Sequence, residues 1–211
     1  MFAARSGFFT RPAGLSVPVA FDAVGAGNTG TTTSLSWTHT ATAGAYVVVG
    51  VATAGDVTLT ATYGGAAMSS LGRQYGNNTP GGVTEFFGLN TVAGGAKTVA
   101  ATLSTATYGC ANSVSYLNVG SVSAPTYSFG SGQNLSISAT CSANQKIVAG
   151  LAGNNTAVTL GSLAGGVNRF SVNSGGAAAL AVSDADVNTT FTAFNSSGFP
   201  AWSGIAVVLI P

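Results

Sequence analysis

Short apolar runs, each ended by glycine, asparagine or proline, follow one another from residue 17 to residue 211. They are rich in valine, threonine, alanine and aromatic residues, and runs of about 4–8 such residues are typical of β-strands. The segment "SLSWTHT" alternates Leu35, Trp37 and His39 with serine and threonine, as a strand with one buried face does. The segment "AYVVVGVAT" at 45–53 is apolar on both faces and predicts a central strand.

Helices are disfavoured along the whole chain. No segment has the apolar spacing of three and four residues that a core-facing helix needs. The chain also contains 30 glycines, and each glycine costs a helix interior about 1 kcal/mol. We therefore expect an all-β, antiparallel protein.

The sequence contains an internal repeat. "LSWTHTATAGAYVVVGVAT" from Leu35 aligns without a gap with "LSISATCSANQKIVAGLAG" from Leu135. Further along, "VTLTATYGGAAM" matches "VTLGSLAGGVNR", and "AKTVAATLS" matches "VNTTFTAFN". The two pseudo-repeats cover about 34–120 and 134–211, and each then closes on an apolar strand.

Two architectures fit this repeat. Residues 17–211 can form one jelly-roll-like antiparallel β-sandwich, or two tandem small β-sandwiches. The stretch at 120–133 is too short and too apolar for a free linker, which favours the single sandwich. The glycine pairs of "YGGAAM" and "AGGVN" are typical of hairpin turns.

Charge is scarce. Only 5% of the 211 residues are charged, against a usual share of about 25%, and the net charge is +1. This balance argues against nucleic acid and against anionic membranes as partners. No run of about 20 apolar residues exists, so we do not expect the protein to be embedded in a membrane. A neutral polar surface suits a protein that is held in a fixed assembly.

The residues that usually perform catalysis are almost missing. Five acidic residues and one histidine do not assemble a hydrolytic triad or a pair of convergent carboxylates, and we expect His39 to be a packed residue. Asp184, Asp186 and Asn188 have the spacing that opens a calcium loop, but the glycine and glutamate of that loop are replaced by threonine and asparagine. We predict no enzyme, no metal site and no cofactor.

The two cysteines, Cys110 and Cys141, are too few to form a disulfide framework. Independent thiols are favoured over a bond between them.

The stretch "GRQYGNNTPGG" at 72–82 is the longest that shows no strand pattern. Tyrosine beside asparagine and glutamine can contact neutral sugars or another protein, although an ordinary hairpin loop has the same composition. The candidate surface-recognition residues are Arg73, Gln74, Tyr75, Asn77, Asn78 and, as a weaker member, Tyr108.

The opening segment "MFAARSGFFTRPAGL" contains two of the six basic residues of the chain, close to three phenylalanines. Arginine and serine break its apolar runs, so it does not match a secretory signal. We expect residues 1–16 to form an extended arm that either packs on its own sandwich or docks on a neighbouring subunit. The candidate anchoring residues are Phe2, Arg5, Phe8, Phe9 and Arg11.

Several segments together resemble small minor tail proteins of phages that infect mycobacteria and related actinobacteria. They are "MFAARSGFF", "VAFDAVGAG", "SLSWTHTATAGAYVVVGVA", "ATYGGAAMSSLG", "FFGL", "AGGAKTVAATLS", "SVSYLNVG" and "WSGIAVVLIP", and they span almost the whole chain. These motifs are loose strand patterns, and the family offers no catalytic residues to carry over.

The resemblance implies a structural virion protein at the tail tip or on a fibre, assembled in the host cytoplasm and contributing to host attachment. Its partners would be other virion proteins, through the arm, and a host envelope glycan. We expect a homo-oligomer, with a trimer suggested by analogy. A capsid decoration protein and a carbohydrate-binding module are the alternatives.

Overall fold

The structure is a computed structural model that describes residues 16–154, 159–173, 177–196 and 201–211. The predicted all-β, antiparallel fold is confirmed: the described chain consists of strands and turns with one three-residue 3₁₀ helix, η1 (Gly76–Asn78). The anchoring residues Phe2, Arg5, Phe8, Phe9 and Arg11 lie outside the described residues.

The first half of the chain forms one continuous sheet that bends into two packed layers, which we call its inner and outer sheets. The long strand β8 (Gly95–Leu117) runs through both layers, and β2 pairs with it along both parts. The inner sheet contains the C-terminal part of β8 with β1 (Ala20–Val24), β3 (Tyr46–Thr53), β6 (Ser69–Tyr75) and β7 (Val83–Leu89). The outer sheet contains the N-terminal part of β8 with β2 (Asn28–Ala41), β4 (Leu59–Tyr63) and β5 (Ala66–Ala67).

The second half repeats this plan. Its inner sheet contains β9 (Ser121–Val122), β10 (Thr126–Ser131), β12 (Lys146–Asn154), β14 (Val167–Asn173), β15 (Ala178–Ala185) and β17 (Ala201–Ile210). Its outer sheet contains β11 (Asn134–Ala139), β13 (Leu160–Ala164) and β16 (Thr189–Asn195). The stretch at 120–133 is not a free linker, because β9 and β10 both pair with β17.

Strand pairing confirms the internal repeat and corrects one part of its alignment. In the first half Leu35 pairs with Ala101, and in the second half Leu135 pairs with Ala193. Ala101 therefore corresponds to Ala193, whereas the sequence match of "AKTVAATLS" with "VNTTFTAFN" places it over Thr192. That match is wrong by one residue, which in a strand would turn every side chain to the opposite face.

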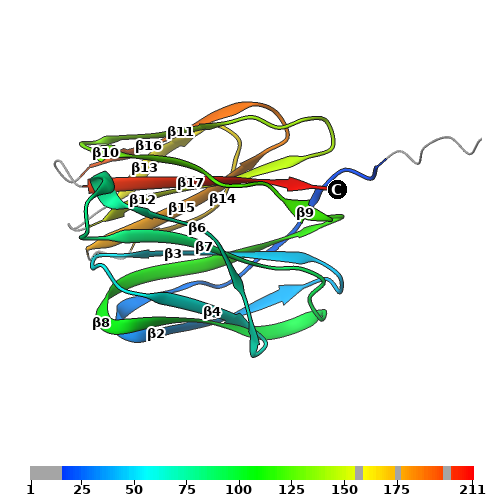
Figure 1. The fold of residues 1–211 in the computed structure, drawn as a ribbon, viewed down its shortest axis with the longest axis horizontal. Coiled ribbons are helices and arrows are strands. Elements are labelled where there is room, and N and C mark those ends of the chain that lie inside the picture. The colour runs from blue at the N-terminus through cyan, green and yellow to red at the C-terminus, as the bar shows by residue number, and fades with distance from the viewer. Residues whose placement is uncertain (1–15, 155–158, 174–176, 197–200) are drawn as a thin grey trace, which may run out of the picture.

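Each half encloses an apolar core between its own two sheets. In the first half Leu35 and Trp37 of β2 pack in one cluster with Val49 of β3. In the second half Ile137 of β11 packs in one cluster with Phe191 of β16. Each half therefore has the two sheets and the separate core of a small sandwich, as in the tandem arrangement. The sheets of the two halves lie on one another in four layers (Figure 1).

A third core joins the two inner sheets, and we call it the interface core. It contains Val48, Phe86 and Tyr116 from the first half, packed against residues such as Leu180 and Ile205 from the second. All eight residues of β3 are buried because one face of the strand lies on its own core and the other lies on the interface core. The expected central strand is thereby confirmed.

Phe86 shows how closely the halves approach. Its ring is fully buried, and a Cβ added at Gly150 of β12 would lie 2.5 Å from its Cζ. The absence of a side chain at Gly150 therefore makes room for the ring of the opposite half.

Both glycine pairs lie in turns. Gly64 and Gly65, with φ of +57° and +85°, join the paired strands β4 and β5, and both have the sign that a type I′ hairpin turn needs. Gly165 and Gly166 have φ of +83° and +70°, but they connect β13 to β14, which belong to different sheets. The expectation of a hairpin is therefore wrong for the second pair.

Candidate functional site

The stretch predicted as irregular at 72–82 is only partly so. Gly72 to Tyr75 belong to strand β6, and only the residues from Gly76 onward form the turn that leads to β7. The expectation of a long loop is wrong here because Gly72 is a packed strand residue: a Cβ at this position would lie 2.9 Å from the Tyr127 hydroxyl and from the Pro125 ring.

The guanidinium of Arg73 forms hydrogen bonds with residues of the first half. It donates to Glu85 Oε2 at 3.0 Å, to Asp56 Oδ1 at 2.8 Å and to the carbonyl of Val57 at 2.9 Å. It also lies 5.3 Å above the centre of the Tyr75 ring. Arg73, Asp56, Glu85 and Tyr75 border a hollow of about 430 Å³, and the hydrogen-bonding groups of Arg73 there are occupied by partners within the protein.

The other recognition candidates differ in exposure. Gln74 is buried and donates to the carbonyl of Tyr75 at 3.1 Å and to Asn78 Oδ1 at 3.3 Å. Asn77 and Asn78 are exposed. Tyr108 is half-buried against the interface core, at the same end of the first half, where its carbonyl accepts a hydrogen bond from the Ala54 amide.

His39 lies in a chain of buried polar groups between the two sheets of the first half. Its Nδ1 is 2.8 Å from Ser113 Oγ, and its Nε2 is 3.0 Å from Ser115 Oγ. Trp37 Nε1 donates to Ser113 Oγ at 2.9 Å, and Ser115 Oγ donates to Asp22 Oδ2 at 2.7 Å. The chain therefore runs from an indole at one end to a carboxylate at the other.

The two end groups of this hydrogen-bonded series determine the position of every proton within it. The indole of Trp37 can only donate, and the ionised carboxylate of Asp22 can only accept. Ser115 thus donates to Asp22 and accepts from the Nε2–H of His39. The unprotonated Nδ1 of His39 accepts from the hydroxyl of Ser113, which itself accepts from Trp37. A neutral His39 satisfies all partners at once.

The pKa values of both titratable members follow from this setting. Burial lowers the pKa of His39, and the charge of Asp22 opposes this effect only in part. Burial alone would raise the pKa of Asp22, but hydrogen bonds from Thr42 and Ser115 outweigh it and lower the pKa. The neutral histidine and the charged aspartate are therefore the stable forms.

This arrangement does not match a hydrolytic triad. A triad needs an accessible nucleophile hydrogen-bonded to a histidine that an acid orients directly. Here Asp22 contacts Ser115 instead of His39, and Ser113 and Ser115 are 0% exposed. As arranged, the chain of polar groups fixes β2 against β8, and His39 is packed as the sequence suggested.

The three residues of the calcium-like spacing bind three different partners instead of a common ion. Asp184 is 1% exposed and binds Arg169, while Asp186 pairs with Lys146. The side chain of Asn188 accepts a hydrogen bond from the Cys141 amide at 2.9 Å. Within the described part of the chain, no group of three or more histidine, cysteine, aspartate or glutamate side chains could hold a metal ion.

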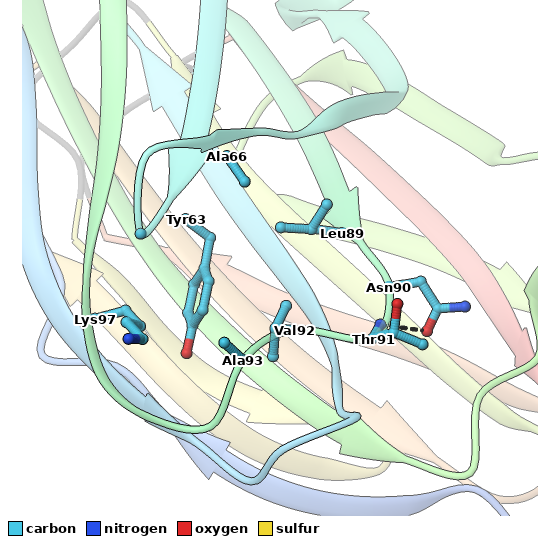
Figure 2. Close-up of a pocket in the computed structure, with 9 residues that line it drawn as sticks. Tyr63, Ala66, Leu89, Asn90, Thr91, Val92, Ala93 and Lys97 are labelled. Atoms are coloured by element: carbon cyan, nitrogen blue, oxygen red, sulfur yellow. Dashed lines mark hydrogen bonds between the residues drawn. The ribbon is translucent and has the colours of Figure 1, made fainter.

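An apolar pocket of about 280 Å³ lies at one end of the first half (Figure 2). The ring of Tyr63 stands beside Lys97, facing Leu89 and Val92, with its hydroxyl towards Ala93. That hydroxyl is closed to solvent and makes no hydrogen bond of good geometry with the described residues. Among the described cations, Lys97 is the one without an ion-pair partner.

The described residues include no helix of the length and apolarity that would span a bilayer. No family model, no curated protein and no solved structure matches the chain.

Proposed function

We propose that this protein is a non-enzymatic structural protein of a virion, a minor tail protein at the tail tip or on a fibre that contributes to host attachment. The class of particle comes from the resemblance of the strand motifs to tail proteins of actinobacterial phages. Support from the structure concerns the kind of contact that this molecule can make with its neighbours.

The observation that carries the proposal is that most charged side chains of the described residues are paired with one another, Lys97 being the exception among the cations. The ion pairs join Arg73 with Asp56 and Glu85, Lys146 with Asp186, and Arg169 with Asp184. Because three of the four described basic residues are paired with carboxylates, long-range attraction to a charged partner is weak. Contacts with neighbours would depend on apolar burial and on neutral hydrogen bonds.

The outer sheet of the first half fits this mode of contact. Its solvent face carries neutral hydroxyl side chains at alternate positions of β2 and β4, and on β8 these hydroxyls alternate with Ala96 and Ala100. The exposed members are Ser34, Ser36, Thr38, Thr40, Thr60, Thr98 and Thr102. Such a face can be covered permanently by another subunit without burying an unpaired charge, so we propose a homo-oligomer, as a trimer, joined to other virion proteins through the N-terminal arm.

The test is to locate the chain in the density of an intact particle and to repeat the measurement after deletion of residues 1–14. We expect density at the tail tip or fibre, and loss of incorporation in the deletion. A matched control replaces Phe2, Phe8 and Phe9 by serine, which keeps the length of the arm. Normal incorporation of the deletion overturns the anchoring role, density on the capsid supports a decoration protein, and absence from the particle overturns the virion assignment.

A further inference from the structure

Phe194 is an exposed aromatic residue near the end of the central strand in the outer sheet of the second half. It belongs to β16, the central strand of that three-stranded sheet, and 39% of it is exposed. Phe191, three residues earlier, points into the core and is 2% exposed. A single exposed apolar residue is ordinary in a folded protein, and Phe129 and Val187 are more exposed than Phe194. What distinguishes Phe194 is the hollow that lies beside its ring.

The space beside the ring is open on one side. Phe194 pairs with Gly161 on β13, where an added Cβ would meet no atom within 4 Å. The register of β13 then shifts between Gly161 and Ala164, and Ser162 within this bulge has a φ of +48°. Next to this glycine, Phe194 and Ser162 of the bulge line a hollow of about 460 Å³, within the range of about 300–1,000 Å³ that small-molecule sites occupy.

Neutral polar side chains surround the ring. Asn134 pairs with Phe194 from the other side, on β11. The hollow is also lined by the polar residues Ser136, Ser162 and Thr192, and by no charged residue. None of these four side chains has a hydrogen-bond partner within the described chain, so their amide and hydroxyl groups are available to a ligand.

The internal repeat supplies a comparison within the same molecule. The position of Phe194 corresponds to Thr102 in the first half, because Ser34 pairs with Thr102 as Asn134 pairs with Phe194. On the opposite side, Thr60 stands where the second half has Gly161. The second half therefore differs from its own repeat by a large ring on the central strand and a missing side chain next to it, two differences that lie beside the hollow.

We propose that this face binds a neutral pyranoside glycan. A sugar ring presents polarised C–H groups on one face and hydroxyls at its edge, and the face of an aromatic ring is electronegative. Phe194 would stack on the sugar face, Gly161 would leave space for the ring, and Asn134 with the nearby hydroxyls would bind its edge. Since no charged residue lines the hollow, an uncharged sugar is the form that it fits.

The experiment is a titration of ¹⁵N-labelled full-length protein followed by NMR. The probes are maltopentaose, cellopentaose, mannopentaose and β-1,4-galactopentaose, with tetragalacturonate as the charged comparison. We expect at least one neutral probe to shift the amide signals of β11, β13 and β16 around Phe194, and the charged probe to bind more weakly. Phe194→Thr, which restores the residue of the first half, should weaken binding at least about tenfold.

Two control variants make the result specific. Val187→Thr changes an exposed apolar side chain of the same half that does not line the hollow and should leave binding unchanged, and both variants should keep the dispersed spectrum of the folded protein. The proposal is overturned if no neutral probe shifts these signals, or if Phe194→Thr binds as well as the parent protein. Concentration-dependent self-association that Phe194→Thr abolishes would assign the face to a second copy instead. None of these outcomes depends on where the protein lies in a particle.

Discussion

The hydroxyl of Tyr116 in β8 donates a 2.9 Å hydrogen bond to Oδ2 of Asp184 in β15, across the interface core between the two halves. Arg169 of β14 binds the same carboxylate through Nε at 2.7 Å and Nη2 at 3.0 Å. Its guanidinium also lies 3.8 Å above the ring of Phe21 in β1. Burial, reinforced by the charge of Asp184, raises the pKa of Tyr116 well above its ordinary value, so the phenol remains a donor.

This contact predicts that Arg169→Met is strongly destabilising. The variant would leave the carboxylate of Asp184, which is 1% exposed, with Tyr116 as its remaining side-chain partner. Loss of one member of a buried ion pair costs about 3–5 kcal/mol, and we expect about 3 kcal/mol here because the Arg169 side chain keeps 19% exposure. Urea unfolding at pH 7 measures this change.

Lys146→Met is the matched control, because the partner carboxylate of Lys146, Asp186, is 71% exposed and can be hydrated when the lysine is lost. We expect this variant to lose less than about 1 kcal/mol. Adding Asp184→Asn to Arg169→Met should recover part of the loss. Equal losses for the two single variants would show that the buried pair does not anchor the halves.

A second prediction concerns Gly25, which lies against the buried polar chain of His39. A Cβ at this position would be 2.4 Å from Ser113 Oγ and 2.9 Å from Trp37 Nε1. Ser113 cannot move away without breaking its bonds to Trp37 and His39. We therefore expect Gly25→Ala to lower the free energy of unfolding by about 2–3 kcal/mol, measured by thermal or urea unfolding.

Gly161→Ala provides the comparison, since its added Cβ meets no atom within 4 Å. Its stability should stay within about 0.5 kcal/mol of the parent protein. If Gly25→Ala proved as stable as Gly161→Ala, the polar chain around His39 would have to be far more adaptable than its short hydrogen bonds indicate.

The sequence predicts the strands well because their buried faces follow local periodicity. Leu35, Trp37 and His39 are buried as their alternation indicates, and β3 is buried on both faces. What covers the second face of β3 could not be predicted, because the interface core joins residues far apart in the chain. The same limit applies to the pairing of Arg169 with Asp184, which depends on how β14 lies beside β15.

The candidate site was harder to predict than the fold. The composition of the stretch at 72–82 predicted Arg73 and Gln74 as recognition residues. It does not reveal that their polar groups form hydrogen bonds within the molecule. Phe194 was missed, although a signal was present. Phe191 and Phe194 are three residues apart in "TTFTAFN", so a strand must place them on opposite faces. The outward one could have been recognised as a surface aromatic residue.

The third prediction is a loss of stability in mild acid that His39 causes. Because its pKa in the folded protein lies below the ordinary value of 6.5, the unfolded chain takes up the proton at higher pH than the native chain does. The contribution of the neutral His39 to the free energy of unfolding is fully present above pH 6.5. It is lost progressively as the pH falls below 6.5 towards the pKa of His39 in the folded protein. Asp22, whose pKa is lowered from 3.8, adds a further loss below that pH.

Urea midpoints measured between pH 7.5 and 5 check the histidine contribution. The chain contains one histidine, so His39→Gln should flatten the profile in this range even if the variant is less stable at every pH. A flat profile in the parent protein, or an equally steep one in His39→Gln, would contradict the assignment of a neutral buried His39.

The fourth prediction is that the two free cysteines react very differently. Cys110 lies in the interface core, and burial raises its pKa to about 12, so at pH 8 on the order of one thiol in ten thousand is ionised. Cys141 is half-buried, and burial together with Asp186 raises its pKa. The thiolate is the reactive form, so we expect iodoacetamide at pH 8 to label native protein at Cys141 only, as peptide mass spectrometry would show.

The variant Cys141→Ser should then give no adduct until guanidinium unfolds it. Because Cys110 can react only when the two inner sheets separate, its labelling rate reports on the interface core. Arg169→Met should raise that rate well above the rate in Lys146→Met, since only the first variant weakens the contact between the halves. Rapid labelling of Cys110 in the unmodified native protein would mean that the halves separate readily and that the interface core does not hold them together.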